Sequence, residues 1–466
     1  MFQQNNARKL TITKILSVMV ILLMVASCAP QTTSTVAPTA ASTAPGGQTE
    51  AAPQPTKAAQ PTEPVAVVPT SVGPVELSMW TEFTAGGEAT GIDALVSAWN
   101  AKSPDMPIKH RPIGNEEFFT VVRTGLSGGE PPDLLQFEGY QQTRDFAAAG
   151  QLLDLTSWWN ENKSRFDLVE PGEYACTFEG KVYCVPYTFL TGWQIYYNPE
   201  ILTVNGIEIP QTFEDFLAAA EKLKAAGITP IALGNKDGWP GEHWWMAFLV
   251  QRCGVDTVYQ AIRMEGAKFT DECFVQATND YQNLATSGYL SEGAASDDYG
   301  TSQAVFLSGQ AAFFQTGSWF ASGWEQTPPP FEVGIMSFPR FKDSPYSGDV
   351  IGAITHVFGI PSNAKNQEAA LKALDFLISD EAAAIWAANG NSSVVKGAVD
   401  AAAPQVIKDI WTNAKSAEKS LPWIENELPP GIGEDKVYNG TVALLSGSMT
   451  SENFLKSIQD ALEASK

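Results

Sequence analysis

The pattern of apolar and polar positions changes period at several places along the chain, from the alternation of a strand to the spacing of a helix. Residues 75–80 alternate, and after a Gly-Gly turn Ile92, Leu95 and Trp99 fall on one helical face. This stretch therefore predicts a strand, a loop and a helix, in that order.

The segment from residue 212 to residue 242 repeats these elements. Thr212 and Asp215 form a capping-box pattern at the start of a helix that Gly227 ends. A strand is expected over residues 228–233, followed by a loop over residues 234–242. The helix is expected to bury Phe213, Phe216, Leu217, Ala220 and Leu223.

A further strand and helix are predicted near residue 360. The strand over residues 357–360 ends at Pro361, a helix covers residues 371–378, and a last amphipathic helix covers residues 454–462. Because strands and helices alternate, we expect an α/β architecture with mainly parallel sheets. Ligands of such folds bind beyond the carboxyl ends of the strands.

The N-terminus has the order of charge, apolar run and cleavage site that export machinery recognises. The apolar run over residues 15–26 is shorter than the roughly 20 residues that span a bilayer. It closes with Val-Ala-Ser-Cys, which resembles the lipobox of bacterial lipoproteins. We therefore predict a signal peptide over residues 1–27 and acylation of Cys28. An ordinary signal peptide with a chance cysteine is the alternative.

The composition changes sharply after Cys28. Residues 28–74 are rich in Pro, Ala, Thr, Ser and Gln, with almost no charge and no aromatic residue, which predicts a disordered tether. Residues 75–466 are long enough for two lobes, each with its own core. We expect this domain to work on the extracytoplasmic face of the cell membrane, at an open cell surface or in a periplasm.

The net charge of −23 argues against partners that carry many negative charges. Nucleic acid and anionic lipid surfaces both attract basic proteins, so neither is expected to bind this chain through its overall charge. The only contact with the membrane that we predict is the lipid on Cys28.

Four cysteines besides Cys28 suit an oxidising compartment. A hairpin with a three-residue loop centred on Gly180 would place Cys176 opposite Cys184. The preferred pairing among three is therefore Cys176–Cys184 with Cys253–Cys273. A metal site is the alternative, but the chain has no Cys-x-x-Cys and its three histidines are isolated, so we expect no metal.

The chain lacks the sequence motifs of several enzyme classes. It has no His-Glu-x-x-His, no phosphate-binding Gly-x-x-x-x-Gly-Lys and no dinucleotide fingerprint. The paired carboxylates of a glycoside hydrolase have no local signature. We interpret Asp297 with Asp298, and Glu425 with Glu427, as solvated loop charges. A binding protein without a cofactor is therefore expected.

Six segments resemble one known family. They include Tyr-Tyr-Asn-Pro-Glu-Ile-Leu at residues 196–202 and Ala-Val-Phe-Leu-Ser-Gly-Gln-Ala-Ala-Phe-Phe at residues 304–314. Their order and spacing are similar to family 1 extracellular solute-binding proteins of bacterial ABC transporters, the sugar-binding lipoproteins related to maltose-binding and glucose-binding proteins. The segments are residues 178–187, 196–202, 210–216, 304–319, 360–370 and 447–462.

The resemblance implies a bilobed periplasmic-binding-protein type II fold with two α/β lobes joined by hinge strands. Lobe 1 would hold about residues 75–186 and 323–361, and lobe 2 about residues 187–322 and 362–466. A monomer of this kind captures a monosaccharide or short oligosaccharide by hinge closure and delivers it to permease subunits.

A sugar site needs aromatic rings against the C–H faces and polar side chains at the rim. Trp80 and Glu88 resemble the Trp and Gly-Gly-Glu opening of glucose-type members, with a core role as the alternative for Trp80. At least one of Trp239, Trp244 and Trp245 is expected in the core. The candidate ligand-binding residues are Trp80, Glu88, Gln136, Tyr187, Trp193, Trp239, Trp244, Trp319 and His356.

The sequence is also compatible with two other functions. An exported glycan-active enzyme would use two carboxylates in the same cleft. A receptor for another solute would need converging Arg or Lys for glycerol phosphate, or several carboxylates with aromatic walls for a polyamine.

Overall fold

The computed structural model describes residues 74–168, 174–325, 327–429 and 431–466. The predicted signal peptide, Cys28 and the tether up to residue 73 lie outside the described residues. No helix among the described residues is long and apolar enough to cross a membrane.

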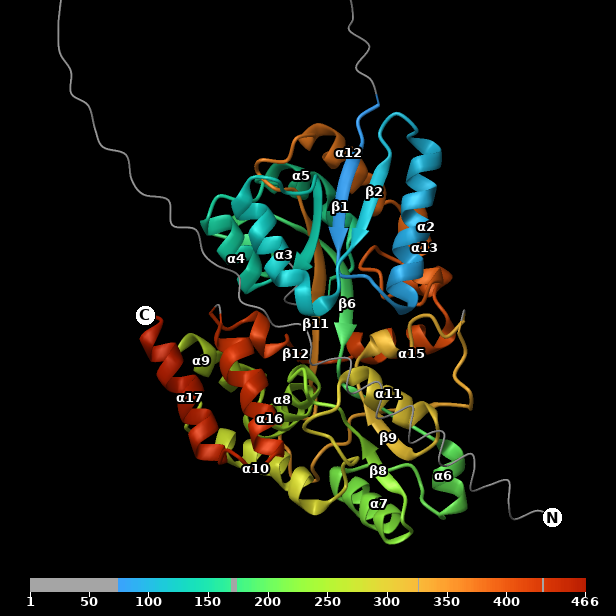
Figure 1. The fold of residues 1–466 in the computed structure, drawn as a ribbon, viewed down its shortest axis with the longest axis vertical. Helices are drawn as coiled ribbons and strands as arrows, with labels where there is room; N and C mark the ends of the chain where they lie inside the picture. The colour runs from blue at the N-terminus through green and yellow to red at the C-terminus, as the bar shows by residue number, and fades with distance from the viewer. Residues whose placement is uncertain (1–73, 169–173, 326, 430) are drawn as a thin grey trace, which may run out of the picture. The chain divides into compact units, whose positions relative to one another are not determined.

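Two mixed sheets organise the described chain (Figure 1). The six-stranded sheet contains β1 (Leu77–Thr81), β2 (Ile108–Pro112), β3 (Leu134–Glu138), β6 (Val185–Thr191), β11 (Asp349–Gly359) and β12 (Lys419–Leu421). The four-stranded sheet contains β7 (Gln194–Tyr197), β8 (Thr229–Ala232), β9 (Ala311–Gln315) and β10 (Gly334–Ser337). A separate hairpin consists of β4 (Thr177–Phe178) and β5 (Lys181–Val182).

Helices connect most of these strands, as an α/β architecture requires. The α-helices are α2 (Gly86–Lys102), α3 (Asn115–Gly128), α4 (Gln141–Ala148), α5 (Thr156–Asn162), α6 (Pro199–Val204), α7 (Phe213–Ala225), α8 (Trp239–Cys253), α9 (Val255–Arg263), α10 (Glu272–Ser287), α11 (Tyr299–Leu307), α12 (Gln367–Leu377), α13 (Asp380–Ala388), α14 (Ala398–Ala402), α15 (Gln405–Lys415), α16 (Asn439–Leu445) and α17 (Ser451–Ala464). Short helical turns are η1 (Lys163–Arg165), η2 (Tyr174–Cys176), η3 (Ser318–Phe320), η4 (Ile424–Asn426) and η5 (Gly433–Tyr438).

The helix predicted after residue 212 is confirmed with its cap. The Thr212 hydroxyl accepts a hydrogen bond from the Asp215 backbone, and the Asp215 carboxylate accepts one from the Thr212 backbone, both at 3.2 Å. The loop predicted over residues 234–242 is too long, because α8 already begins at Trp239. Gly238 before it has φ +84, and a Cβ there would stand 2.3 Å from the Tyr438 side chain, so this close approach requires glycine.

The expectation of mainly parallel sheets is wrong. β1 runs parallel to β2 and β3, but β11 is antiparallel to β3 and β6, and β7 is antiparallel to β9 and β10. The strands that break the pattern are those through which the chain passes between sheets. Such a strand does not follow a crossover helix within its own sheet, so the parallel rule does not govern it.

The chain passes directly from a strand of one sheet to a strand of the other at two places among the described residues. β6 leads through Gly192 and Trp193 directly into β7, and β10 of the four-stranded sheet precedes β11 of the six-stranded sheet. The predicted return segment, residues 323–361, thus contains strands of both sheets. We propose residues 338–348 as the second lobe boundary, which leaves β10 with the four-stranded sheet.

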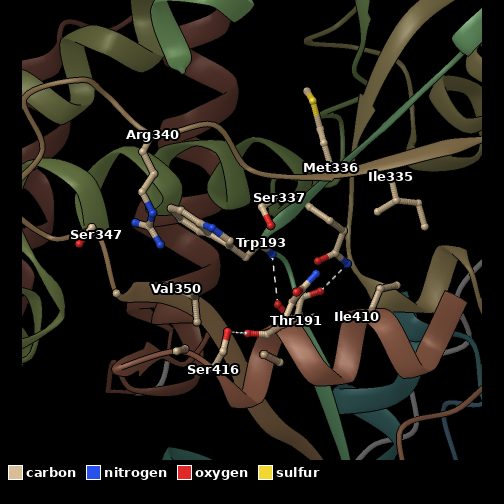
Figure 2. Close-up of a pocket in the computed structure, with 15 residues that line it drawn as sticks. Thr191, Trp193, Ile335, Met336, Ser337, Arg340, Ser347, Val350, Ile410 and Ser416 are labelled. Carbon is tan, nitrogen blue, oxygen red and sulfur yellow. Dashed lines mark hydrogen bonds between the residues drawn. The ribbon is translucent and has the colours of Figure 1, made fainter. Parts of the chain in front are cut away.

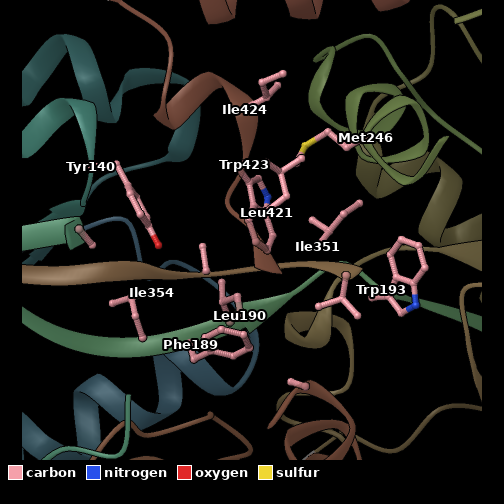
Figure 3. Close-up of a cluster of buried hydrophobic side chains, with 14 of the residues drawn as sticks. Tyr140, Phe189, Leu190, Trp193, Met246, Ile351, Ile354, Leu421, Trp423 and Ile424 are labelled. Carbon is pink, nitrogen blue, oxygen red and sulfur yellow. The ribbon is translucent and has the colours of Figure 1, made fainter. Parts of the chain in front are cut away.

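Apolar side chains pack along the paired strands β6 and β11. Figure 3 shows Phe189 and Leu190 of β6 beside Ile351 and Ile354 of β11, with Trp423 against the same strands. These five side chains are buried, so the strands that join the sheets are also part of the core.

Both predicted disulfides are present, Cys176–Cys184 and Cys253–Cys273. The predicted loop length of the hairpin is wrong, however. Thr177 pairs with Val182, so the loop is the two residues Glu179 and Gly180, which have φ +48 and +75 as in a type I′ turn. The disulfide therefore joins residues one step out of register.

Removing the longer bridge should destabilise the protein measurably. Replacement of Cys253 and Cys273 by serine frees a loop of 20 residues and should lower the free energy of unfolding by about 3 kcal/mol. Urea titration of the purified protein measures this change. Wild-type protein with dithiothreitol should lose stability too, whereas an unchanged midpoint in the double variant contradicts the prediction.

Candidate functional site

Two glutamates stand at the carboxyl ends of neighbouring parallel strands. Glu82 directly follows β1, and Glu138 is the last residue of β3. Gln136, a predicted site residue, fixes Glu82: its amide oxygen accepts from the Glu82 backbone at 2.9 Å, and its amide nitrogen donates to the Glu82 carboxylate at 3.0 Å. This is the sheet edge where the α/β rule places ligands.

His356 lies opposite Glu138 on the antiparallel strand β11, at a β-bulge in the pairing with β6. Its Nε2 is 3.0 Å from Glu82 Oε1, and its Nδ1 is 3.2 Å from Glu88 Oε1 in the first turn of α2. Burial alone would lower the pKa of His356, but the charges and hydrogen bonds of Glu88 and Glu82 outweigh it and raise the pKa to about 10. His356 is therefore an imidazolium held between two carboxylates.

Four aromatic rings from separate segments form a second group, which we call the aromatic box: Trp239, His243, Trp319 and Trp423. The ring centroids of Trp319 are 5.8 Å from Trp239, 5.6 Å from His243 and 6.2 Å from Trp423. Trp239 and His243 belong to the first turns of α8, Trp319 to η3, and Trp423 to the segment after β12. Trp239 and Trp319 remain partly exposed.

Glu242 and His243 are buried polar residues within this group, with 0% and 1% exposure. Neither oxygen of Glu242 and neither ring nitrogen of His243 makes a hydrogen bond of good geometry, although Ile424 and Glu425 are close enough to influence the Glu242 pKa. His243 Nε2 is 3.7 Å from Glu242 Oε2, which is too long for a hydrogen bond. Burial lowers the pKa of His243 to about 3, so this ring is neutral.

The two groups are connected by acidic side chains that we call the carboxyl cluster: Glu82, Glu138, Glu242 and Glu425. Burial, and then the charges of Glu82 and Glu425, raise the pKa of Glu138 well above its usual range. Burial, and then Glu425, do the same for Glu242, and burial raises the pKa of Glu425. The Tyr438 hydroxyl donates to Glu425 Oε1 at 3.0 Å.

An ion pair lies beside this cluster. The Arg144 guanidinium of α4 donates to Glu427 at 3.1 Å, and the Glu427 side chain is only 2% exposed. The Tyr174 ring is 5.2 Å from Arg144 and 5.5 Å from Arg263 of α9. The interpretation of Glu425 and Glu427 as solvated loop charges is therefore wrong, because Glu427 is buried against Arg144, and Glu425 is half-buried in η4 and accepts from Tyr438. Asp298, in contrast, is exposed and caps α11.

Six of the nine predicted binding residues belong to or border these groups. Gln136 and His356 contact Glu82, and Glu88 contacts His356. Trp239 and Trp319 are in the aromatic box. The Tyr187 ring is 5.0 Å from Trp386, and Trp386 contacts Phe83, which lies beside His356. The Tyr187 hydroxyl has no partner among the described residues.

The other three pack elsewhere. Trp80 contacts the Arg111 guanidinium at 4.9 Å, beside β2. Trp244 is fully buried, 5.3 Å from Phe338. Trp193 lines a cavity of about 210 Å³ where β6 leads into β7, and Figure 2 shows it beside Arg340 there.

Several residues of the site were not predicted, namely Glu82, Glu138, Glu242, His243, Trp423 and Glu425. Glu82 and Glu138 could have been predicted from the sequence. Glu82 follows the strand predicted over residues 75–80, and Glu138 ends an apolar strand. Glu242 and His243 sit one turn from Trp239, so a correct helix start would have placed them on the same side. Nothing local distinguishes Trp423 and Glu425.

Comparison with known proteins gives this arrangement a context. Residues 85–384 match the model of the family described as bacterial extracellular solute-binding protein. An uncharacterised extracellular-binding protein of an ABC transporter from Pyrococcus horikoshii is 26% identical over 398 residues, covering 83% of this chain and 82% of that protein. A multiple sugar-binding protein from Streptococcus mutans is 26% identical, covering 65% of this chain and 71% of its own length.

A solved chitin oligosaccharide binding protein has a similar fold, with a TM-score of 0.75 and 23% identity, over 84% of this chain and 98% of that one. The expected bilobed α/β fold is thereby confirmed, as is the expectation of a receptor rather than an enzyme, located outside the cytoplasm. The chain belongs to the bacterial extracellular solute-binding proteins.

Proposed function

We propose that this protein is the substrate-binding lipoprotein of an ABC importer, anchored through Cys28, which captures a monosaccharide or short oligosaccharide and delivers it to permease subunits. The observation that supports this most is the aromatic box beside buried, unpartnered polar groups. A sugar ring stacked on Trp319 would supply hydroxyls to Glu242 and His243, which now lack partners. The names of the relatives that bind sugars agree with this reading.

The proposed contacts come from both sheets. Glu88, Gln136, Tyr187 and His356 would meet the solute from the six-stranded sheet, and Trp239 and Trp319 from the segments around the four-stranded sheet. Contacts that exist only when both sides touch the solute favour the closed state, so binding would shift the population toward closure. Trp80, Trp193 and Trp244 have packing that favours a structural role.

A thermal-shift screen of the full chain in mild detergent tests this function. The panel consists of sugars, polyols, phosphorylated polyols and polyamines. A solute at one hundred times its dissociation constant should add about 2.7 kcal/mol of stability. If a phosphoester or a simple polyamine shifts melting while no carbohydrate does, the proposal fails.

Replacement of Trp319 by alanine should weaken binding of the identified sugar at least about tenfold, because the stacking surface is lost. Titration calorimetry measures the affinity. Trp158→Ala is the matched control, since Trp158 lies on α5 and donates to Asp375 at 2.6 Å. Equal affinity of Trp319→Ala and the control contradicts stacking at this position.

A further inference from the structure

The acidic groups at the site outnumber the cations that face them. Glu82, Glu88, Glu138, Glu242 and Glu425 approach one another from α2, α8, η4 and two strand ends. His356 is the cation among them, and it is already shared by Glu82 and Glu88. Glu242 and Glu425 are therefore left without a positive partner in the contacts of the described residues.

Nearby basic groups do not balance this pair. His243 is neutral because of burial, and its Nε2 is too far from Glu242 to donate. Arg144 is paired with Glu427 at 3.1 Å. Glu425 accepts a hydrogen bond from Tyr438, whereas neither oxygen of Glu242 has a partner of good geometry among the described residues. A buried carboxyl group without a cation is costly, so either a proton or a ligand must neutralise it.

Resting on the proposed function, we propose that the solute is a carbohydrate with a free, protonated amino group. Glu242 and Glu425 bind the ammonium, and the ring lies against Trp319 in the aromatic box. Three features suit this chemistry. The two carboxyl groups supply acceptors for the three ammonium donors, the tryptophan faces attract a cation, and His243 can meet a ring hydroxyl.

Binding of an ammonium group by these carboxyl groups should release protons, which can be measured. Without solute, burial raises the pKa values of Glu138, Glu242 and Glu425, which favours protonated carboxyl groups in the cluster. An entering ammonium favours the ionised carboxylates, so roughly one proton should leave for each amine bound near pH 7. The titratable groups that face this pair are Glu82, Glu138, His243, His356, Glu434 and Tyr438.

Calorimetry of the full chain in mild detergent tests the inference with matched ligands. Glucosamine, its short β-1,4-linked oligomers, their N-acetylated forms and the hydroxyl analogues differ only at the amine position. At pH 7 the amine should bind at least about tenfold more tightly than its N-acetylated form, and the preference should shrink at pH 5 as the carboxyl groups hold their protons. Two buffers of different ionisation enthalpy should report proton release with the amine alone.

Glu242→Gln should remove the preference for the amine and the proton release, so that the amine and its hydroxyl analogue bind with equal affinity. Glu265→Gln, in the exposed turn after α9, is the matched control and should behave as wild type. Equal or tighter binding of the neutral analogues by wild type overturns this inference but supports the proposed function. Binding of none of these carbohydrates overturns both. Equal binding of putrescine overturns the carbohydrate part.

Discussion

The free energy of unfolding is expected to fall by several kcal/mol as the pH rises from about 6.5 to about 10. His356 has a pKa of about 10 in the folded chain and about 6.5 when unfolded, so its contribution is complete below the lower value and disappears above the higher one. At about 1.4 kcal/mol per pKa unit, this amounts to at most about 5 kcal/mol. Glu138 and Glu242 also hold protons more tightly when folded, so they change stability in the same direction.

Urea titrations at pH 6, 8 and 10 measure this dependence. His356→Gln should flatten the curve above pH 6.5, because no imidazolium remains between Glu82 and Glu88. His243→Gln is the control: His243 is neutral across this range, so its replacement should leave the slope unchanged. The same slope in His356→Gln and wild type contradicts the assignment of a protonated His356.

Loss of Arg144 is expected to cost about 3–5 kcal/mol, the second large effect. Arg144→Met removes the cation that donates to the buried Glu427 carboxylate and leaves Arg263 as a more distant one, and a buried charge without its partner is strongly unfavourable. The free energy of unfolding from urea titration at pH 7 measures the loss. Arg123→Met, at an exposed position of α3, is the matched control and should change stability by less than about 0.5 kcal/mol.

The cause of that loss can be separated from lost packing. The double variant Arg144→Met with Glu427→Gln removes the uncompensated charge and should recover more than half of the lost stability. If Arg144→Met is no worse than the Arg123 control, the ion pair does not stabilise the fold.

Local patterns predicted the elements that depend on neighbouring residues. α7 with its Thr212–Asp215 cap, and α2 with Ile92, Leu95 and Trp99 buried, follow from spacing and capping chemistry. The direction of β6, β7 and β11 could not be read in this way. Their orientation depends on which sheet each strand joins, and that is decided by segments far apart in the sequence.

Residues of the candidate site likewise differ in whether the local sequence could predict them. Trp239 and Trp319 were predicted as site residues because their loops follow strands or resemble family segments, and His356 because it lies in a predicted first-lobe strand. Glu427 pairs with Arg144, which is 283 residues away in the sequence, and Glu425 accepts from Tyr438, so composition near residue 425 suggested solvated charges. The surroundings of these two carboxyl groups in the fold therefore could not be read from the local sequence.

Neither disulfide crosses from one sheet to the other. One closes an eight-residue separation beside the start of β6, and the other ties α8 to α10 over 20 residues. Oxidation after export can therefore protect each side against proteases of the surrounding medium without clamping the two connecting segments. Each cross-link lies within one side, so a reducing medium is expected to lower the stability of each side without changing the segments that connect the two sheets.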